Sequence, residues 1–182
     1  MEIILASASP RRKELLSKLV DEFIIITPTI DEYLYPFEQL SLEKAKIIAK
    51  DHPDDIIIAA DTLVIKDNVV FGKPKDDEDA KRMLQELSGE SHQVKTVYTI
   101  LSINKNIEIT RIITSTVYFN NLSSQLIDDY VKTKSPLDKA GGYGIQDKAF
   151  DLVNHIEGSY SNIVGLPIEE LKKSINYILI VQ

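Results

Sequence analysis

The strongest constraint on the fold is the apolar run IIIAA at residues 56–60, which is followed directly by Asp61. A short, uninterrupted run of this kind is typical of a central strand covered on both faces, because a strand with one exposed face alternates with polar residues. Strand and helix patterns also alternate along the rest of the chain. The sequence therefore predicts an α/β fold with a mixed central sheet flanked by helices.

Capping residues and periodicity predict where the elements lie. Ser9 can cap a helix and Pro10 suits its first turn, where an N–H group has no partner. Leu84 belongs to an apolar stripe at i, i+3, i+4 and i+7 spacing, behind an acidic first turn that suits the helix dipole. Further helices are expected at Ser41, at Ser123 and after Pro167. Strands are expected at residues 2–5, 23–26, 56–60, 63–65, 69–71, 93–103, 107–119 and 177–181.

The composition argues against several classes of protein. The 182 residues carry a net charge of -7, which disfavours binding of a nucleic-acid polymer through a broad basic surface. Cysteine is absent, and the three histidines, His52, His92 and His155, lack metal-ligand spacing, so no zinc site is expected. No stretch approaches the ~18 apolar residues of a membrane span, and the N-terminus is predicted to be a short strand rather than a signal peptide. We expect one domain over residues 1–182, located in the cytoplasm.

The segment LASASPRR, residues 5–12, places two adjacent arginines at an expected helix start. Unpaired N–H groups and the positive end of the helix dipole lie at such a position. With the hydroxyls of Ser7 and Ser9, the guanidinium groups of Arg11 and Arg12 could converge on one phosphate, which arginine binds bidentately. The alternative is an ordinary helix start with two surface arginines.

Two acidic positions are candidates for catalysis or metal binding. Asp61 is expected to end the buried strand, where a carboxylate is costly unless it has partners or a function. Ligands also gather beyond the carboxyl ends of strands in open α/β sheets, so Asp61 is either a general base or metal ligand, or a turn residue that caps its own backbone. Asp31 and Glu32 could ligate a hard cation such as Mg²⁺, or belong to a plain polar loop.

Two loops carry further candidates. Lys73 in FGKPK could meet a phosphate with its ammonium group, or lie in solvent. The segment DKAGGYGIQD, residues 138–147, has glycines that allow close approach of a ligand, and Gln146 has the donor and acceptor that a nucleobase edge requires. The alternative is a connecting turn. Taken with the arginines and carboxylates, these loops favour metal-assisted attack of water on a nucleotide phosphate.

The order of these motifs resembles the Maf family. LASASPRRKELL, IDE, EKA, AADTLV, GKP, DKAGGYGIQ and EGSYSNIVGLP follow one another as in that family, from Ile3 to about Leu171. The resemblance implies a fold like that of Maf proteins and inosine triphosphate pyrophosphatases, with two lobes and an active-site cleft. It also implies a homodimeric nucleoside triphosphate pyrophosphatase that releases a monophosphate and pyrophosphate and requires a divalent cation, Mg²⁺ or alternatively Mn²⁺ or Co²⁺.

The resemblance also implies roles for individual residues. Asp61 matches the proton acceptor, and we expect Glu32 and Asp61 to hold the metal. The substrate-binding positions are matched by Ser7, Arg11, Arg12, Lys44, Thr62, Lys73 and Gln146, of which Arg12, Thr62 and Gln146 are associated with the choice of substrate.

Three local features resemble the branch of the family that acts on dTTP and UTP: Arg11 directly follows Pro10, Thr62 follows Asp61, and GYGIQ is intact. Asp147 departs from the pattern, because glycine is common there, and its negative charge is expected to weaken or retune binding. The alternatives are a non-catalytic, nucleotide-binding regulator of cell division, since family members are associated with septum inhibition, or a pyrophosphatase for inosine-type nucleotides or 7-methyl-GTP.

Overall fold

The computed structural model describes residues 2–181, and the chain divides into two compact units. The first unit comprises Met1–Asp61, Thr96–Ile113 and Gly165–Gln182, and the second comprises Thr62–Lys95 and Thr114–Val164. The strands are β1 (Ile3–Leu5), β2 (Ile24–Ile25), β3 (Ile56–Lys66), β4 (Val69–Phe71), β5 (Ser91–Ser102), β6 (Ile107–Phe119) and β7 (Val153–Glu157). The α-helices are α1 (Pro10–Leu16), α2 (Phe37–Ala49), α3 (Asp77–Leu87), α4 (Ser124–Lys132), α5 (Tyr160–Val164) and α6 (Ile168–Val181). Short 3-10 helices are η1 (Glu32–Leu34), η2 (Ser135–Asp138), η3 (Ala140–Gly142) and η4 (Lys148–Phe150).

The strands form a mixed sheet in the order β2-β1-β3-β5-β6-β7, and β4 pairs with β3. β1 pairs in parallel with both β2 and β3, whereas β7 is antiparallel to β6 and β4 is antiparallel to β3. The strands β3, β5 and β6 each run from one unit into the other along the chain. These features confirm the predicted α/β class with a mixed central sheet flanked by helices.

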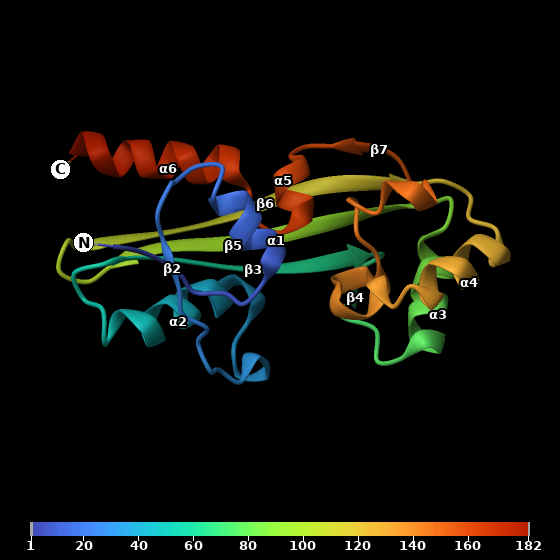
Figure 1. The fold of residues 1–182 in the computed structure, drawn as a ribbon, viewed down its shortest axis with the longest axis horizontal. Helices are drawn as coiled ribbons and strands as arrows, with labels where there is room; N and C mark the ends of the chain where they lie inside the picture. The colour runs from blue at the N-terminus through green and yellow to red at the C-terminus, as the bar shows by residue number, and fades with distance from the viewer. Residues whose placement is uncertain (1, 182) are drawn as a thin grey trace. The chain divides into compact units, whose positions relative to one another are not determined.

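In the first unit, α2 covers one face of the strands and α6 covers the other (Figure 1). Ala45 and Ile48 of α2 belong to the same buried cluster as Ile57 and Ala59 of β3. On the opposite face, the Tyr98 hydroxyl of β5 lies 2.9 Å from the Ser174 hydroxyl of α6. Residues 57–60 are fully buried, so the prediction that this strand is covered on both faces is confirmed.

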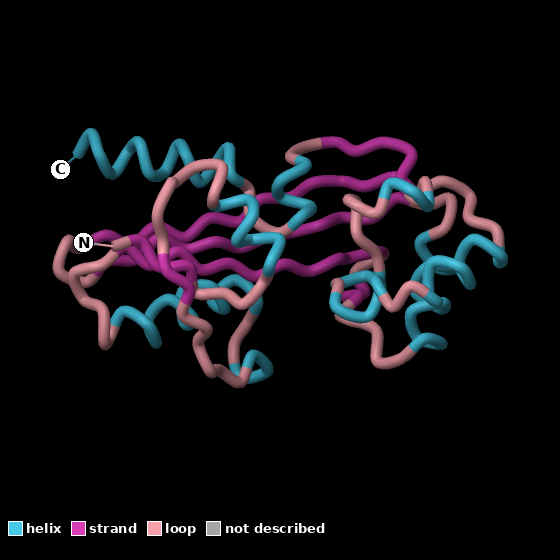
Figure 2. Tube along the Cα trace, in the orientation of Figure 1, coloured by secondary structure: helices cyan, strands magenta, loops and turns pink. Residues whose placement is uncertain are grey.

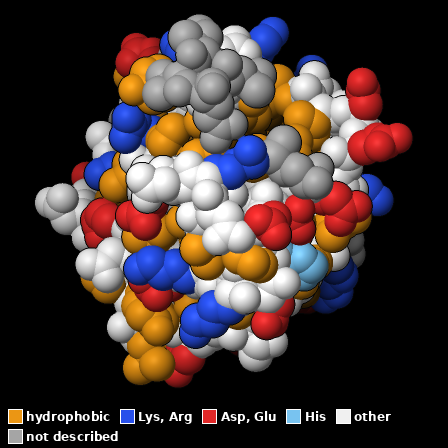
Figure 3. Space-filling model, turned by 90° about the vertical axis from the view of Figure 1, so that its left-hand side faces the viewer, with side chains coloured by type: hydrophobic (Ala, Val, Ile, Leu, Met, Phe, Trp, Pro, Cys, Tyr) orange, Lys and Arg blue, Asp and Glu red, His pale blue; other side chains and the backbone are white. Residues whose placement is uncertain are grey.

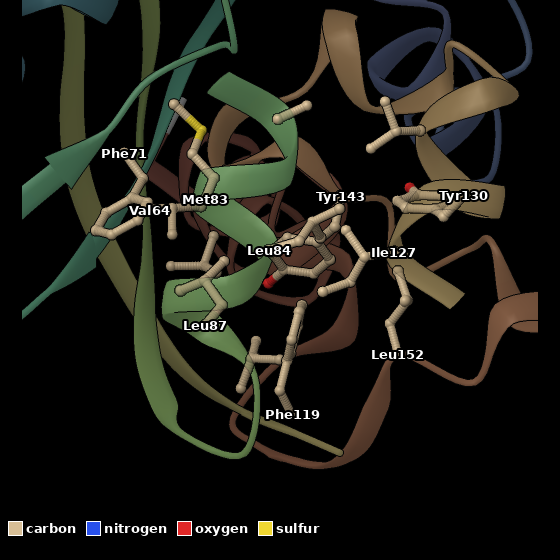
Figure 4. Packing of buried hydrophobic residues seen from close by; sticks show 14 residues of the cluster. Val64, Phe71, Met83, Leu84, Leu87, Phe119, Ile127, Tyr130, Tyr143 and Leu152 are labelled. Carbon is tan, nitrogen blue, oxygen red and sulfur yellow. The ribbon is translucent and has the colours of Figure 1, made fainter. Parts of the chain in front are cut away.

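The second unit has its own core, built by α3, α4 and the glycine-rich segment against the strands (Figures 2 and 4). Leu84 of α3 and Ile127 of α4 lie in this core with Phe119 and Tyr143, whose rings meet edge to face at 4.7 Å. The apolar stripe predicted for α3 and the helix expected at Ser123 are therefore confirmed. The caps at Ser9 and Ser123 are confirmed as well, because Ser9 accepts a hydrogen bond from the N–H of Arg12 and Ser123 accepts one from the N–H of Leu126.

Two sequence predictions about helices are wrong. Helix α2 begins at Phe37 rather than at Ser41, which is fully buried inside the helix with its hydroxyl 2.7 Å from that of Thr99. Residues 177–181, predicted as a closing strand, continue α6. An apolar run of this length fits either structure, and the packing of Leu171 and Ile178, seven residues apart on one buried stripe, selects the helix.

The strand that carries Asp61 also differs from the prediction. It was expected to end at Asp61, but β3 continues to Lys66, includes the separate strand expected at residues 63–65, and forms a hairpin with β4. Asp67 and Asn68, at the turn of that hairpin, both have positive φ, as a type I′ turn requires. Asp61 therefore lies in the middle of a strand, and its carboxylate needs partners there. No helix within the described residues is both long and apolar enough to cross a membrane.

The core of the second unit contains a histidine that should make folding sensitive to acid. His92 is buried, its Nε2 lies 2.7 Å from the Tyr143 hydroxyl, and burial, assisted by the charge of Lys66, lowers its pKa from 6.5 to about 4. Between those values His92 is protonated in the unfolded chain but not in the folded chain. The free energy of unfolding therefore decreases as the pH falls from 6.5 to about 4.

We therefore predict that His92→Gln reduces the slope of the unfolding free energy against pH over this range, by up to about 1.4 kcal/mol per pH unit. Urea unfolding at several pH values between 4 and 7.5 measures the slope. His155→Gln is the control, because His155 is exposed. Parallel curves for wild type and His92→Gln would contradict the assignment.

Candidate active site

Helix α1 presents its arginines at the end of a tight turn. Ser7 Oγ accepts hydrogen bonds from the N–H of Ser9 at 3.3 Å and from Nη1 of Arg12 at 3.2 Å. Arg12 Nε donates to the carbonyl of Gly165 at 2.8 Å, which links α1 to the segment before α6. The helix has seven residues and its Arg12 N–H is already bonded to Ser9, so the guanidinium groups, rather than the helix end, carry the positive charge.

A second group of charges surrounds Lys44. Its ammonium group forms ion pairs with Glu32, at 2.6 Å, and with Asp61. The exposed fractions of the three side chains are 10% for Lys44, 17% for Asp61 and 55% for Glu32. The Lys44 ammonium thus pairs at once with the largely buried carboxylate of Asp61 and the more exposed carboxylate of Glu32.

The packing of α2 on β3 explains this meeting. Alternate residues of a strand share a face, so Asp61 continues the face of Ile57 and Ala59, on which α2 packs. Lys44 precedes Ala45 and lies four residues before Ile48, both of which pack on that face. The apolar contacts between α2 and β3 therefore position the Lys44 ammonium beside the carboxylate of Asp61.

The arginines and the carboxylates belong to one electrostatic cluster. Burial lowers the pKa of Arg12, the charge of Asp61 raises it, and Arg11 and Glu32 act in opposite directions. A guanidinium group stays protonated in proteins, so Arg12 remains a fixed positive charge close to these groups. The structure therefore brings together six of the residues selected from the sequence, all in the first unit: Ser7, Arg11, Arg12, Glu32, Lys44 and Asp61.

The carboxylates of Glu32 and Asp61 are ligands of the type that Mg²⁺ takes when substrate phosphates complete its coordination. Within the described residues, no three His, Asp or Glu side chains form a ready-made metal site. Mg²⁺, however, is commonly held by one or two carboxylates together with substrate phosphates. Glu32 and Asp61 already converge on one cation, the Lys44 ammonium. The carboxylate of Asp31 accepts from the N–H of Tyr33 at the start of η1.

The remaining candidates, Thr62, Lys73 and Gln146, lie in the second unit. The N–H of Gly141 donates to the carbonyl of Gly72 at 3.0 Å, so the GKP and AGGYG segments run against each other. Gly141 has a φ of 74°, and a Cβ atom there would approach the Val64 side chain to 3.1 Å, so this contact requires glycine. Lys73 and Gln146 are both exposed and available to a ligand, and Thr62 is half-buried.

Sequence reasoning missed the role of Gly165. It belongs to the EGSYSNIVGLP motif, which had been given no function, yet its carbonyl orients Arg12. The signal in the sequence was the glycine itself, because glycine often occupies positions of positive φ. Gly165 has a φ of 123°, a conformation that other residues rarely adopt. Lys44 was found through family resemblance alone, since nothing in the local pattern distinguishes it from a surface charge.

The chain resembles known proteins in both sequence and fold. A family model described as "Maf-like protein" matches residues 2–178. A relative named "dTTP/UTP pyrophosphatase" from Clostridioides difficile (strain 630) is 46% identical over 178 residues, covering 94% of this chain and 92% of the relative. A relative of the same name from Desulfotalea psychrophila is 42% identical, covering 96% and 93%. The Staphylococcus aureus Ham1 protein shares the fold, with a TM-score of 0.55 and 16% identity over 97% of this chain and 99% of that one.

The ion pairs of Lys44 lead to a stability prediction. Lys44→Met leaves the Asp61 charge in a largely buried place without the ammonium, so we expect a loss of about 1–3 kcal/mol of unfolding free energy. The double variant Lys44→Met with Asp61→Asn removes both charges and should recover part of that loss. Urea unfolding at pH 7 measures all three proteins.

Lys46→Met is the matched control for this experiment. Lys46 lies on the same helix and pairs with Glu43, but its side chain is 46% exposed, and such surface pairs contribute about 0–1 kcal/mol. Equal losses in Lys44→Met and Lys46→Met would show that the Lys44 ion pairs do not stabilise the site.

Proposed function

Because the chain belongs to the Maf family, we propose that it hydrolyses dTTP and UTP to the nucleoside monophosphate and pyrophosphate. The observation that carries the proposal is the joint ion pairing of Lys44 with Glu32 and Asp61, beside the fixed charge of Arg12. Two neighbouring carboxylates beside arginines suit metal-assisted phosphoryl chemistry, because carboxylates hold a metal and arginines bind phosphates. The relatives named "dTTP/UTP pyrophosphatase" at 42–46% identity support pyrimidine triphosphates as the substrates.

The catalytic roles follow from the position of each charge. Asp61 would orient the attacking water and accept its proton, because its carboxylate lies in the partly buried centre of the cluster. Arg11 and Arg12 would bind the phosphates, and Arg12 would keep its orientation through Ser7 and Gly165. Lys73 would stabilise the negative charge of the departing pyrophosphate.

The role proposed for Glu32 and Asp61 also includes holding Mg²⁺, with Mn²⁺ or Co²⁺ as alternatives. When bound, such a cation neutralises phosphate charge and polarises the phosphoryl group. Lys44 keeps the two carboxylates together, and the same ammonium can turn to a phosphate oxygen of the substrate, as expected of a substrate-binding lysine. We therefore propose that the Lys44 ammonium pairs with Glu32 and Asp61 in the free protein, and that the metal ion takes its place when the nucleotide binds.

We also propose that the substrate is a free nucleotide and that two copies of the chain associate. On the face shown in Figure 3, basic and acidic side chains are interspersed, which does not favour a nucleic-acid polymer. Ile24 and Ile25 are 37% and 42% exposed on β2, at the end of the sheet order, and could be covered by a second copy. Light scattering of the purified protein tests the homodimer, and a monomer at all concentrations would exclude it.

The proposed activity predicts a specific pattern of products. With Mg²⁺, wild-type protein should release pyrophosphate fastest from dTTP and UTP in a panel that also contains CTP, ATP, GTP, ITP and 7-methyl-GTP. Chelation with EDTA should abolish release. Gln146→Ala should lower the ratio of kcat/KM for dTTP to that for GTP, because the amide is proposed to bind the pyrimidine edge.

The alternatives give different results in the same panel. Preference for ITP or 7-methyl-GTP would assign the protein to another pyrophosphatase class. Absence of release from every nucleotide would favour a nucleotide-binding regulator of cell division. If Gln146→Ala leaves the dTTP to GTP ratio unchanged, Gln146 does not read the base.

Asp61→Asn provides the sharpest test of the catalytic assignment. The amide keeps the size of the side chain but is a poor proton acceptor, so we expect kcat to fall by about 10²–10⁴-fold while nucleotide binding is largely kept. Stopped assays and isothermal titration with dTTP measure the two quantities. Asp31→Asn makes the same chemical change at an exposed residue, and its amide oxygen can still accept from the N–H of Tyr33, so it should have near wild-type turnover. Wild-type turnover in Asp61→Asn would exclude Asp61 as the proton acceptor.

A further inference from the structure

The segment that carries Gln146 is closed by two successive turns. The carbonyl of Gly144 accepts from the N–H of Asp147 at 3.0 Å, and the carbonyl of Gln146 accepts from the N–H of Lys148 at 2.9 Å. Asp147 has φ -81° and ψ 53°, the conformation of the central residue of an inverse γ-turn. The exposed Gln146 side chain therefore projects from a backbone that is fixed on both sides.

The side chain of Asp147 ties these turns to the second unit's core. Its Oδ2 accepts from the hydroxyl of Tyr130 at 2.6 Å and from the hydroxyl of Ser135 at 2.8 Å. Tyr130, on α4, is fully buried, and its ring packs against that of Phe150 at 4.9 Å. A single carboxylate oxygen thus joins the loop to both α4 and η2.

The Tyr130 hydroxyl closes a ring of hydrogen bonds. It donates to Asp147 and accepts from the N–H of Gly144 at 2.9 Å, while the Gly144 carbonyl accepts from the N–H of Asp147. Burial raises the pKa of Tyr130, and the hydrogen bond with Asp147 raises it further, so the hydroxyl keeps its proton and its direction of donation. Both ends of the turn are therefore held by the same tyrosine.

A lysine reinforces the contact through Ser135. Lys139 Nζ donates to the carbonyl of Ser135 at 2.6 Å and to its hydroxyl at 3.0 Å, and the Lys139 side chain is 14% exposed. The hydroxyl of Ser135 can accept from this ammonium while it donates to Asp147. The arrangement is also tight, since a Cβ atom on Gly144 would lie 2.9 Å from Asp147 Oδ2.

We propose that Asp147 is a positioning residue for nucleobase selection, which holds the turn that presents Gln146 to the base. The inference rests on the proposed function, because it takes Gln146 as the residue that reads the pyrimidine. It replaces the expectation that the charge of Asp147 acts directly on the nucleotide. The Oδ2 oxygen is engaged by two hydroxyl donors of the same unit, so its role is to fix the loop.

An asparagine substitution separates the positioning role from an effect of charge. Because one oxygen of Asp147 accepts both hydroxyl hydrogen bonds, the single carbonyl oxygen of Asp147→Asn can accept both as well. Asp147→Ala removes the acceptor and the charge together. A positioning role predicts that Asp147→Asn resembles wild type, whereas a charge effect predicts that it resembles Asp147→Ala.

The experiment measures kcat and KM for dTTP and GTP in wild type, Asp147→Asn, Asp147→Ala and Tyr130→Phe. We expect the dTTP to GTP ratio of kcat/KM to fall on the order of tenfold in Asp147→Ala and Tyr130→Phe, mainly through the KM for dTTP. In Asp147→Asn the ratio should stay within about twofold of wild type. Asp151→Asn is the charge-matched control, because Asp151 is exposed and its positive φ suits asparagine.

Stability and binding measurements keep the inference separate from the proposed function. Thermal unfolding shows whether a variant is folded, and Ser135→Ala, which removes one of the two donors, replaces Asp147→Ala if the latter does not fold. Titration with non-hydrolysable α,β-imido analogues of dUTP and dGTP gives the same selectivity without turnover. Absence of turnover in wild type would refute the proposed function alone.

Three results would overturn the inference itself. The first is an unchanged selectivity ratio in Asp147→Ala or, where it is used, in Ser135→Ala. The second is an equal loss in Asp147→Asn and Asp147→Ala, which would assign the effect to charge. The third is wild-type binding of the two analogues with equal affinity or not at all, because no base selectivity would then exist for Asp147 to support.

Discussion

The ion pairs of Lys44 with Glu32 and Asp61 are the interaction on which the rest of the site depends. A carboxylate in the middle of a covered strand is costly, and the ammonium from α2 offsets that cost. The apolar packing of α2 on β3 fixes where the ammonium lies, so the position of the charge cluster depends on the core of the first unit. In the proposed function, the same cluster would supply the proton acceptor and hold the metal.

The second unit supplies a different kind of precision. Its core of aliphatic and aromatic side chains supports the contact between Gly72 and Gly141, where backbone meets backbone. Next to it, Tyr130 and Asp147 hold the turn that carries Gln146. The first unit therefore gathers the charged side chains of the candidate site, whereas the second holds an exposed amide on a hydrogen-bonded turn.

Much of this fold could be predicted from the sequence because local signals agreed with packing. The stripe of α3 and the cap of α4 are examples, as is the covered strand at residues 57–60. Predictions failed where tertiary contacts decided between local options. Ser41 has the chemistry of a cap but is used inside α2 against Thr99, and the apolar end of α6 is helical because Leu171 and Ile178 are buried on one stripe. Local patterns selected the arginines and carboxylates of the site, and family resemblance added Lys44. The role of Gly165 emerged only from the hydrogen bond that it accepts from Arg12.

The central claim is that the cluster around Asp61 directs water to the α-phosphorus of a nucleoside triphosphate. Hydrolysis of dTTP in H₂¹⁸O with Mg²⁺, followed by mass spectrometry of the products, tests it most directly. The account predicts dTMP that carries the ¹⁸O label together with unlabelled pyrophosphate. Label in the pyrophosphate, or formation of dTDP and inorganic phosphate, would contradict it.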